Sequence, residues 1–417
     1  MHILFLTHYF PPEVNAPATR TFEHCRRWVK AGHKVTVITC APNCPTGVVF
    51  KDYQNHWRDE EWIEGIRVIR VWTYLAPNKG FFKRVVNFLS YMLRAAWEAR
   101  RVSDVDVTIA TSPQLFCGWA GVFARRKNIP FVLEIRDLWP ESIVAVGAMK
   151  RNFVIRALEW LEKKLYQSAD HIVTVGDDYR QGLIDRGVAD DDISVFPNGV
   201  DLAQFSRADG SSMREEFGAG DRFVCGYIGT VGMAHGLEVM LNAAETLKRQ
   251  GRDDIQFWIV GEGARRAELE QLAAEKGLAN VRFTGLLPKE KMPEVISACD
   301  SCLVHLKGAD LFSTVMPSKV FEYMALNVPI IMGVRGQACT IVEQGKAGIP
   351  MTPDDPQSLL ECIEIIRNKG PHAFQGRDYV AKHFNRDKLA AGMLETLLDV
   401  VHEARPTIPL IHHKKAG

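Results

Sequence analysis

The feature that most constrains this chain is an alternation of short apolar runs with longer amphipathic stretches, which continues through nearly all of its 417 residues. In the first half the apolar runs include HILFLTHY, HKVTVITC, VDVTIATS and FVLEIRD, and in the second half FVCGYIG, IQFWIVG, SCLVHL and VPIIMG. Strands that alternate with helices indicate βαβ units and mostly parallel sheets. The sequence therefore predicts an α/β protein with two doubly wound domains.

A polar segment rich in glycine and serine separates the two halves. Residues 202–221 show no strong hydrophobic period, so we expect a linker there. We predict an N-terminal domain over residues 1–201 and a second domain over residues 202–385. Residues 386–417 should begin with a helix that packs back on the N-terminal domain and end in a polar tail. A cleft between two such domains is a common place for a small-molecule site.

Composition narrows the class of protein. The chain is 47% hydrophobic and 24% charged, with a formal net charge of +1, so nothing predicts binding to nucleic acid. The nine cysteines are scattered, and no secretory signal is recognised, so we expect a cytoplasmic protein. No run of about 18 apolar residues predicts a transmembrane helix. Cys299 and Cys302 form a lone CxxC that we interpret as buried thiols, and we expect no metal site.

The most informative short motif is PSKVFEYMALNVP, residues Pro317–Pro329. It is typical of a polar turn, a short helix and the start of an apolar strand. The helix would begin at the C-terminal edge of a parallel sheet, where open α/β sheets bind ligands, and its free N–H groups would suit a phosphate. Lys319 adds positive charge, and Glu322, one turn later, can accept hydrogen bonds from two sugar hydroxyls.

Two strand-to-helix loops are further candidates. GYIGTVGMAHG contains Gly229, Thr230 and Gly232, whose small side chains would let the backbone approach a phosphate, although such loops are as often glycine-rich for packing alone. YFPPEVNAPATR could bring Asn15 and Ala16 close to a ligand. The alternative is an ordinary connection, but its length exceeds the usual ~2–6 residues and favours a function.

Three other strand ends carry polar or glycine residues. EIRDLWPES places Arg136 and Asp137 where they could contact a substrate, although an ion pair that holds the loop is the alternative. VGEG places Glu262, and VRFTGLL places Gly285 and Leu286, where they would flank a nucleotide base.

The order of these motifs carries a resemblance. YFPPE, FPNGVD, VGEG, VRFTG and EYMALNVPII, spread over nearly the whole chain, resemble the retaining glycosyltransferases with the GT-B fold, in which two Rossmann-like domains face a central cleft. EIRDLWPES and PSKVFEYMA are similar to the L-fucosamine transferase subgroup of bacterial O-antigen and capsule assembly. The resemblance implies a UDP-sugar or other nucleotide-sugar donor on the second domain. It also implies a polyprenyl-diphosphate-linked glycan as acceptor on the first.

The resemblance also implies roles for single residues. In the Glu-x7-Glu motif of that family the second glutamate contacts ribose and the first contacts the donor sugar. Glu322 matches the second, whereas the first falls on Thr314, which suits an unusual donor such as a deoxy-amino sugar. The basic residues that clamp the diphosphate fall near Thr230 and His235, so Lys319 is expected to replace their charge. The histidine of the first domain aligns with Arg136.

Together these interpretations define the expected site. The residues expected to bind the donor are Asn15, Ala16, Gly229, Thr230, Gly232, Glu262, Gly285, Leu286, Thr314, Ser318, Lys319 and Glu322. Catalysis is assigned to Glu322, Lys319, Arg136 and Asp137. Backbone N–H groups and Lys319 would stabilise the leaving phosphate, which could itself accept the proton of the acceptor. The resemblance implies no metal and no cofactor besides the donor.

The segment Lys79–Arg101 mixes aromatic, aliphatic and basic residues at helical spacing. Basic amphipathic helices of this kind lie in membrane interfaces, although a helix that packs on the sheet with a solvated basic face is the alternative. Because a lipid-linked acceptor is expected, we predict peripheral binding to the inner face of the cytoplasmic membrane. The residues assigned to that contact are Phe81, Phe82, Lys83 and Arg84.

Three other functions remain open at this point. The same transfer could use a small soluble acceptor, such as an inositol or a thiol-precursor metabolite. A GT-B epimerase acting on UDP-GlcNAc is a second alternative, which should carry catalytic carboxylates and histidine in its cleft. A non-catalytic nucleotide-sugar-binding protein is the third, because Thr314 and Thr230 depart from the family pattern.

Overall fold

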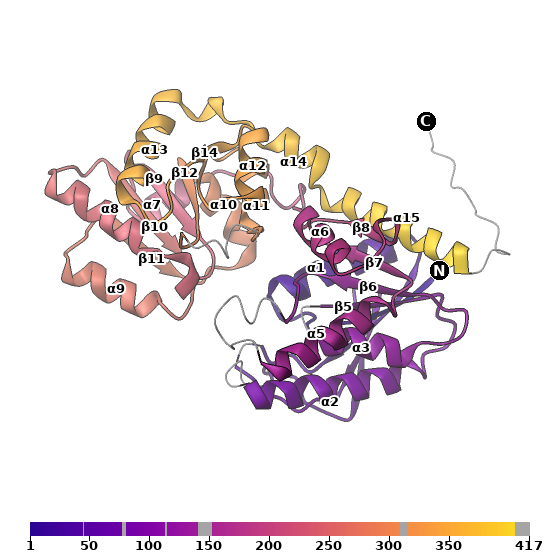
Figure 1. Cartoon of the computed structure of the whole chain (residues 1–417). Coiled ribbons are helices and arrows are strands. Elements are labelled where there is room, and N and C mark those ends of the chain that lie inside the picture. Colours follow the sequence, from indigo (N-terminus) through magenta and orange to yellow (C-terminus); the bar gives the residue numbers. More distant parts are fainter. Residues whose placement is uncertain (45, 77–80, 113–114, 141–151, 309–314, 405–417) are drawn as a thin grey trace. The chain divides into compact units, whose positions relative to one another are not determined.

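The computed structural model describes residues 1–44, 46–76, 81–112, 115–140, 152–308 and 315–404. The chain divides into two compact units (Figure 1). Unit 1 comprises Met1–Asn198 together with the segment from Arg386 onward, and unit 2 comprises Gly199–Asn385. The chain therefore passes between the units twice, after Asn198 and after Asn385.

Within its described residues, unit 1 contains an eight-stranded sheet in the order β3-β4-β2-β1-β5-β6-β7-β8. All neighbouring strands in it are parallel except β3 and β4. The strands are β1 (His2–Leu6), β2 (Lys34–Cys40), β3 (Arg58–Ile63), β4 (Ile66–Val71), β5 (Val107–Thr111), β6 (Phe131–Ile135), β7 (His171–Thr174) and β8 (Ile193–Val195). The helices are α1 (Ala16–Lys30), α2 (Phe81–Ala99), α3 (Leu115–Ala124), α5 (Phe153–Tyr166), α6 (Asp177–Asp185) and α15 (Arg386–Ala404).

Unit 2 contains, within its described residues, a six-stranded sheet in the order β11-β10-β9-β12-β13-β14, in which all pairings are parallel. The strands are β9 (Phe223–Ile228), β10 (Ile255–Val260), β11 (Val281–Gly285), β12 (Ser301–His305), β13 (Ile330–Gly333) and β14 (Gly348–Pro350). The helices are α7 (Ser211–Glu216), α8 (Glu238–Arg249), α9 (Arg266–Glu275), α10 (Met292–Ser297), α11 (Lys319–Ala325), α12 (Gln337–Gln344), α13 (Pro356–Lys369) and α14 (Arg377–His383). Helix α7 lies in the stretch 202–221 that we read as a linker.

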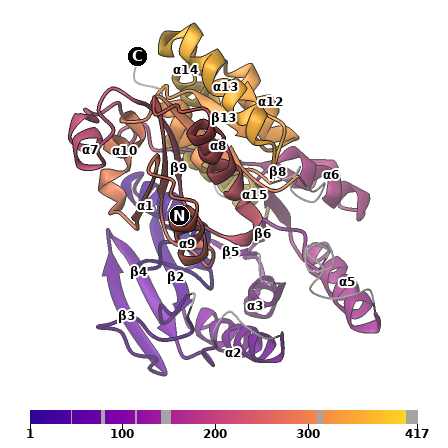
Figure 2. The same ribbon diagram turned by 90° about the vertical axis from the view of Figure 1, so that its left-hand side faces the viewer.

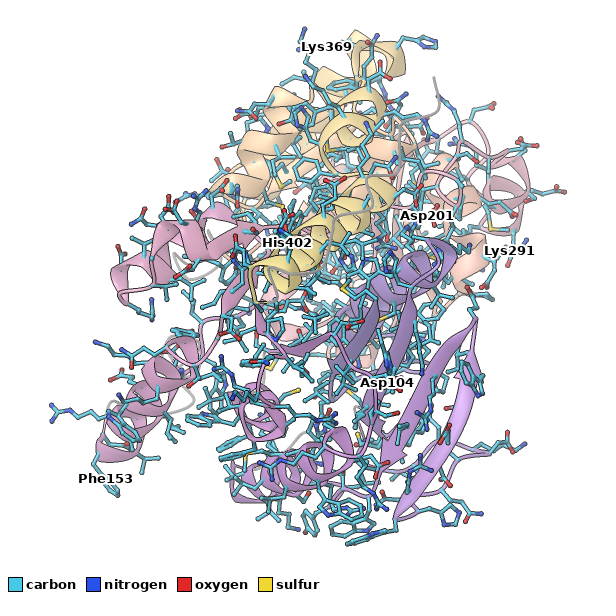
Figure 3. The ribbon with its side chains drawn as sticks, turned by 90° about the vertical axis from the view of Figure 1, so that its right-hand side faces the viewer. Asp104, Phe153, Asp201, Lys291, Lys369 and His402 are labelled. Carbon is cyan, nitrogen blue, oxygen red and sulfur yellow. The ribbon has the colours of Figure 1, made fainter. Side chains whose placement is uncertain are left out.

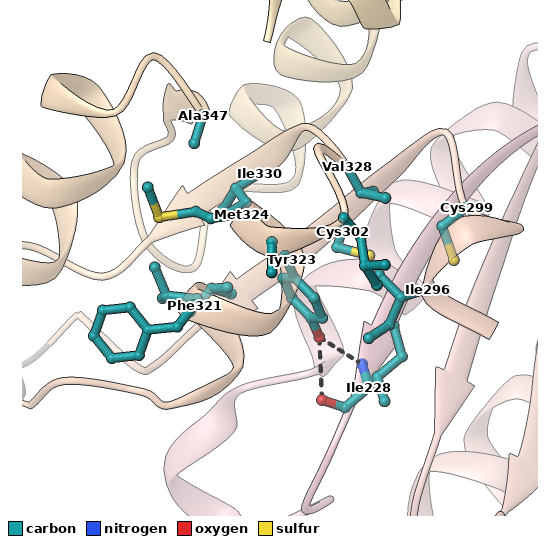
Figure 4. Packing of buried hydrophobic residues seen from close by; sticks show 14 of the residues in the cluster. Ile228, Ile296, Cys299, Cys302, Phe321, Tyr323, Met324, Val328, Ile330 and Ala347 are labelled. Carbon is teal, nitrogen blue, oxygen red and sulfur yellow. Dashed lines mark hydrogen bonds between the residues drawn. The ribbon is translucent and has the colours of Figure 1, made fainter. Parts of the chain in front are cut away.

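Apolar residues cover both faces of each sheet. β1 and β5 are buried along their whole length, as expected for parallel strands with helices on both sides. One apolar layer of unit 2 lies between its sheet and α11, where Phe321, Tyr323 and Met324 are fully buried (Figure 4). Charged side chains such as Lys291 and Lys369 lie on the outside of that unit (Figure 3). The predicted α/β class with two doubly wound domains is confirmed.

The C-terminal helix α15 belongs to unit 1. The indole Nε1 of Trp28, on α1, donates a 2.9 Å hydrogen bond to the carbonyl of Ala390. Arg27 of the same helix pairs with Asp387 at 2.6 Å. Met393 and Leu397 are fully buried in the layer that also holds Trp28. Helix α15 thus completes the cover over one face of the first sheet.

Candidate functional site

The parallel strands of unit 2 end at one edge of their sheet, and glycines follow or finish β9, β10 and β11. Gly229 follows β9, Gly261 follows β10, and Gly285 ends β11. A Cβ on Gly261 would lie 2.0 Å from the carbonyl oxygen of Gly229, so this position has no room for a side chain. The Gly261 N–H donates to the Gly285 carbonyl at 2.9 Å. These glycines therefore let three loops pack directly on one another.

Three N–H groups of the glycine-rich loop are already engaged within the protein. The N–H of Gly229 donates to the carbonyl of Val260, and that of Val231 donates to the carbonyl of Glu262, both at 2.8 Å. The N–H of Gly232 donates to His235 Nδ1 at 3.3 Å. This loop has a structural reason for its glycines, and the contact of Gly229, Thr230 and Gly232 with a phosphate stays a prediction.

Helix α11 is fixed to the end of β9 by Tyr323. The buried hydroxyl of Tyr323 accepts a hydrogen bond from the N–H of Ile228 and donates one to its carbonyl, both at 3.2 Å (Figure 4). The side chain of Ser318, the residue before the helix, makes no capping hydrogen bond. Tyr323 thereby sets the position of Lys319, which lies one turn earlier on the same helix.

Lys319 places an ammonium group at this edge of the sheet. Its Nζ lies 3.7 Å from the centroid of the Tyr227 ring, a cation–π contact. A Cβ on Gly229 would stand 2.7 Å from that Nζ, so the glycine leaves the room that the ammonium occupies. Burial lowers the Lys319 pKa to about 7, while the negative charge of Glu322 opposes the shift. The Tyr227 hydroxyl is held by the Thr230 carbonyl at 2.7 Å.

Other residues that we predict to bind the sugar donor lie around the same edge of the sheet. Glu322 is half-buried on α11, one turn after Lys319. Glu262 is exposed and forms an ion pair with Arg266 at the start of α9. The place of a Cβ on Gly285 lies 2.9 Å from Arg266 Nη1, so these three residues meet. Leu286 is 74% exposed beside them.

Thr314 lies outside the described residues. Arg266 was missed by the sequence reasoning, although its spacing of four residues from Glu262 is the usual signal for a helical ion pair.

A pair of histidines beside Lys319 was also missed as a unit. His305, at the end of β12, is fully buried, and its Nδ1 lies 2.7 Å from the carbonyl of His235. Its Nε2 accepts a hydrogen bond of 2.9 Å from the N–H of Asp354. The ring of His235 meets the Tyr227 ring edge to face at 5.9 Å. The sequence offered only a weak signal, a histidine at the end of an apolar strand.

In unit 1, Arg136 follows β6 at the C-terminal edge of the sheet. Its backbone N–H donates to Ser112 Oγ at 2.7 Å, and its guanidinium lies 3.4 Å from the Pro17 carbonyl in the first turn of α1. Burial lowers the Arg136 pKa to about 10, and Arg20 adds to the shift while Glu134 opposes it. Asp137 lines a small hollow with Trp139 and Tyr166.

A buried ion pair beneath Arg136 was not predicted. Arg20 Nε lies 2.9 Å from Glu134 Oε1, and both side chains are almost fully buried. Burial opposes ionisation of Glu134, but Arg20 and Arg136 outweigh it and lower the carboxyl pKa to about 2. Arg20 also donates to the carbonyls of Phe196 and Pro197, at 2.8 and 3.0 Å. It thereby ties α1 to the segment that ends at Asn198, where the chain leaves unit 1.

The loop before α1 has internal partners. Asn15 caps the helix, because its side chain accepts a 2.9 Å hydrogen bond from the N–H of Ala18. Glu13 Oε1 accepts hydrogen bonds from the N–H groups of Asn43 and Cys44, both at 2.8 Å. Ala16 is exposed at the first position of α1. Donor contacts of Asn15 and Ala16 stay predictions.

Helix α2 has two different faces. Phe88 and Tyr91 are buried against the sheet, and the helix packs on β2 and β4 (Figure 2). Its outer face exposes Lys83, Arg84, Leu93 and Trp97, and the guanidinium of Arg94 stacks at 3.6 Å on the exposed Trp57 ring.

The side chains of Phe81 and Phe82 lie outside the described residues. No helix in the described part of the chain is long and apolar enough to cross a bilayer. No group of three or more metal-binding side chains is arranged around a common point there.

Comparison with known proteins agrees with this architecture. Residues 15–199 match the glycosyl transferase 4-like domain, and residues 222–368 match the glycosyl transferases group 1 domain. The chain is 25% identical over 406 residues to the putative colanic acid biosynthesis glycosyl transferase WcaI of Escherichia coli (strain K12), covering 93% of this chain and 98% of that protein.

Two solved structures share the fold. The chain superposes on sucrose-phosphate synthase from Thermosynechococcus elongatus with a TM-score of 0.71 at 17% identity, over 97% of this chain and 100% of that one. It superposes on Anabaena HepE, solved in complex with UDP and glucose, with a TM-score of 0.69 at 19% identity, over 95% and 99%. The domain matches and relatives support a glycosyltransferase, and the fold is GT-B.

Proposed function

We propose that this chain is a retaining glycosyltransferase that moves a sugar from a UDP-sugar to a lipid-diphosphate-linked glycan during the synthesis of a bacterial surface polysaccharide. The sugar we propose is a deoxy-amino sugar such as N-acetyl-L-fucosamine. The observation that carries the proposal is the Lys319 ammonium, which lies on Tyr227 at the edge where the parallel strands of unit 2 end. The similarity to WcaI, whose name refers to colanic acid biosynthesis, supports a role for this chain in surface-polysaccharide synthesis.

The geometry of unit 2 suits a nucleotide diphosphate. Open α/β sheets bind ligands beyond the carboxyl ends of their strands, where Lys319 and Glu322 lie on one short helix. The ammonium would neutralise a phosphate, and the carboxylate would accept hydrogen bonds from the ribose hydroxyls. Glu262, Gly285 and Leu286 would flank the base. HepE, which has the same fold, was solved with UDP, and this supports the choice of nucleotide.

The transfer step would need little covalent help from the protein. As the bond from the sugar to the β-phosphate breaks, negative charge grows on that phosphate, and Lys319 would stabilise it. Attack by the acceptor hydroxyl on the same face of the sugar would let the phosphate oxygen accept the hydroxyl proton. Arg136 and Asp137, at the edge of the sheet in unit 1, would contact the acceptor or the donor sugar. That this chemistry needs no metal stays a prediction.

Thermal unfolding with a panel of nucleotide sugars tests the proposal. A true donor at ~100 times its Kd stabilises the protein by ~2.7 kcal/mol. Glu322→Ala should abolish that shift for every nucleotide sugar, whereas Glu343→Ala, an exposed carboxylate on α12, should retain it. An undiminished shift in Glu322→Ala contradicts the ribose assignment. A turnover assay with the donor so found then separates transfer to an acceptor from epimerisation and from binding alone.

We also propose that the N-terminal part of α2 places the enzyme on the inner leaflet. Lys83 and Arg84 are exposed there, and anionic lipids attract such residues. Changing Phe81, Phe82, Lys83 and Arg84 together to polar neutral residues should reduce sedimentation with anionic liposomes and leave nucleotide binding intact. Phe153→Gln, at an 83% exposed phenylalanine of α5, is the matched control. Unchanged sedimentation of the fourfold variant would refute the membrane contact and favour a soluble acceptor.

A further inference from the structure

Hydrogen bonds fix the protonation state of His235. Its Nδ1 accepts the N–H of Gly232 at 3.3 Å, so the ring proton must sit on Nε2. Burial, the charge of Lys319 and the neighbouring His305 all lower the His235 pKa, which lies at about 4. Near neutral pH this side chain is therefore an uncharged imidazole whose Nε2–H is the donor.

His305 keeps that arrangement in place. Its Nε2 accepts the N–H of Asp354, so its own proton lies on Nδ1 and donates to the carbonyl of His235. Asp354 is held in turn, because its Oδ2 accepts a 2.7 Å hydrogen bond from the N–H of Gly308. One neutral form of each histidine satisfies all of these bonds. The loop after β9 is thus anchored to the ends of β12 and β14 through uncharged groups.

Lys319 is half-buried, and within the described residues it forms no ion pair. The groups that face it are the Tyr227 ring of β9, Cys302 of β12, Glu322 of its own helix, and His235. Glu322 is the acidic one, and it acts on Lys319 through its field rather than through an ion pair within 4 Å. The neighbouring imidazole adds no negative charge.

We propose that the diphosphate of the donor meets one titrating cation, Lys319, and one neutral donor, the Nε2–H of His235, so that donor binding takes up a proton. The inference rests on the proposed function, because the anion is the diphosphate of the nucleotide sugar. A clamp of two permanently charged residues would show no such uptake. The difference lies in His235 and Thr230, the positions that the resemblance assigns to basic residues.

The sign of the effect follows from linkage. A bound anion stabilises the ammonium form, so binding raises the Lys319 pKa from its value of about 7 in the free protein. Above that pH the free protein holds mostly the neutral amine and must take a proton from solvent when the donor binds. Affinity should therefore fall with rising pH, by up to about tenfold per pH unit once the free amine is neutral.

Calorimetric titration with UDP-glucose in buffers of different ionisation enthalpy measures the uptake. Both phosphates of this probe are esterified, so the probe itself does not titrate near neutral pH. Wild-type protein should take up between about 0.4 and 0.9 proton at about pH 8, for a pKa that binding raises by about one to three units, and less than about 0.3 proton at about pH 6.5. Arginine stays charged at these pH values, so Lys319→Arg should bind UDP-glucose without proton uptake. Binding of UDP-glucose by the wild type without uptake at about pH 8 overturns the inference and leaves the proposed function intact.

The role of His235 needs its own pair of variants. Glutamine can place an amide N–H near the position of imidazole Nε2, so His235→Gln should bind UDP-glucose within about threefold of the wild type. His235→Leu removes the donor and should lose about tenfold or more, because hydrogen bonds to charged groups are the strong ones. Equal affinities of these two variants would exclude His235 from the site.

A third variant tests whether the neutrality of His235 matters. His235→Lys places a second cation beside Lys319 and should lower the Lys319 pKa, so proton uptake should begin at a lower pH than in the wild type. An uptake that covers the same pH range as in the wild type contradicts the placement of His235 beside Lys319. If folded wild-type protein binds neither UDP-glucose nor any nucleotide sugar of the thermal-unfolding panel, the proposed function and the inference fail together.

Discussion

The two units present opposite electrostatic designs at the same place in their folds, the C-terminal edge of a parallel sheet. In unit 1 the charges are paired with one another, as Arg20 and Glu134 are at 2.9 Å beneath Arg136. In unit 2 the corresponding edge holds Lys319 on an aromatic ring beside a neutral histidine. In a buried ion pair each charge is stabilised by the other. A desolvated lysine that has no acidic partner is stabilised in its charged form when an anionic ligand binds. The first arrangement serves structure, and we propose that the second serves binding.

The largest effect is expected from breaking the ion pair of unit 1. Glu134→Gln keeps the shape of the side chain but leaves Arg20 and Arg136 without their carboxylate, and breaking a buried pair costs about 3–5 kcal/mol. Chemical denaturation measures the loss. Glu60→Gln is the control, because the Glu60 pKa is also lowered to about 2, by hydrogen bonding to Arg67, yet that pair is at the surface. Its cost should stay below about 1 kcal/mol.

The same carboxylate predicts how stability depends on pH. The folded pKa of Glu134, about 2, lies below the unfolded value, so its contribution is present above about pH 4.3 and is lost as the pH falls towards 2. Denaturation midpoints of the wild type should fall through this window. The decline should be shallower in Glu134→Gln. Parallel decline of both proteins would show that Glu134 contributes little.

Removing Lys319 should separate binding from stability. Lys319→Met should weaken UDP-glucose binding by about 30-fold or more at slightly acid pH, since losing a charged partner is costly. Its stability should not fall. The folded pKa of Lys319 lies below the unfolded value, so the unfolded chain binds more protons between about pH 7 and pH 10, and wild-type stability rises with pH there. The rise in stability with pH should be smaller in Lys319→Met. An equal rise in the two proteins would contradict the claim that desolvation lowers the Lys319 pKa in the folded protein.

Gly229→Ala should move the ammonium rather than remove it. The added Cβ would lie 2.7 Å from Lys319 Nζ, at a residue whose φ of +140° side chains rarely adopt. We expect UDP-glucose affinity to fall by about tenfold, together with a stability loss of about 1–3 kcal/mol from the strained backbone. In Gly218→Ala, at φ +67° with no atom within 4 Å, only stability should change. Unaltered affinity in Gly229→Ala would mean that this contact does not position Lys319.

The smallest effect concerns the bond between α11 and β9. Tyr323→Phe removes the hydroxyl that serves both the N–H and the carbonyl of Ile228, and should cost about 1–3 kcal/mol of stability by leaving buried groups unpaired. It should also weaken donor binding slightly, by loosening Lys319. Tyr379→Phe, whose hydroxyl contacts Gln344 at the surface, is the control and should cost under about 1 kcal/mol. Equal losses in the two variants would remove the special role of Tyr323.

Much of the fold could be read from the sequence, because buried parallel strands are continuous apolar runs such as HILFLTHY. The edge strand β3 was missed, since its sequence RDEEWI is polar and half-exposed. Its signal was the Glu64–Gly65 turn, with φ of 45° and 79°, which leads into β4. A strand that is buried on both faces can be recognised in the sequence as a continuous apolar run. A half-exposed strand at the edge of a sheet has no such run.

The site was predictable only in part. Motif order pointed to Lys319 and Glu322, and the structure brings them together on α11. The partners of Arg20 could not be found, because Glu134 and Phe196 lie more than 100 residues away in the chain. The sequence could not show why residue 229 is a glycine, because the space beside it is filled by the side chain of Lys319, which lies on another element. Contacts across a sheet edge leave no periodic signal.

The most direct test of this account is a titration of the Lys319 amine by NMR, with the signal of 13Cε-labelled lysine assigned through Lys319→Arg. The account predicts a midpoint near pH 7 in the free protein, well below the ordinary value of a lysine. Saturating UDP-glucose should raise that midpoint by at least about one pH unit, because the diphosphate stabilises the ammonium. An ordinary midpoint that UDP-glucose does not move would contradict the claim that Lys319 is the cation of the donor site.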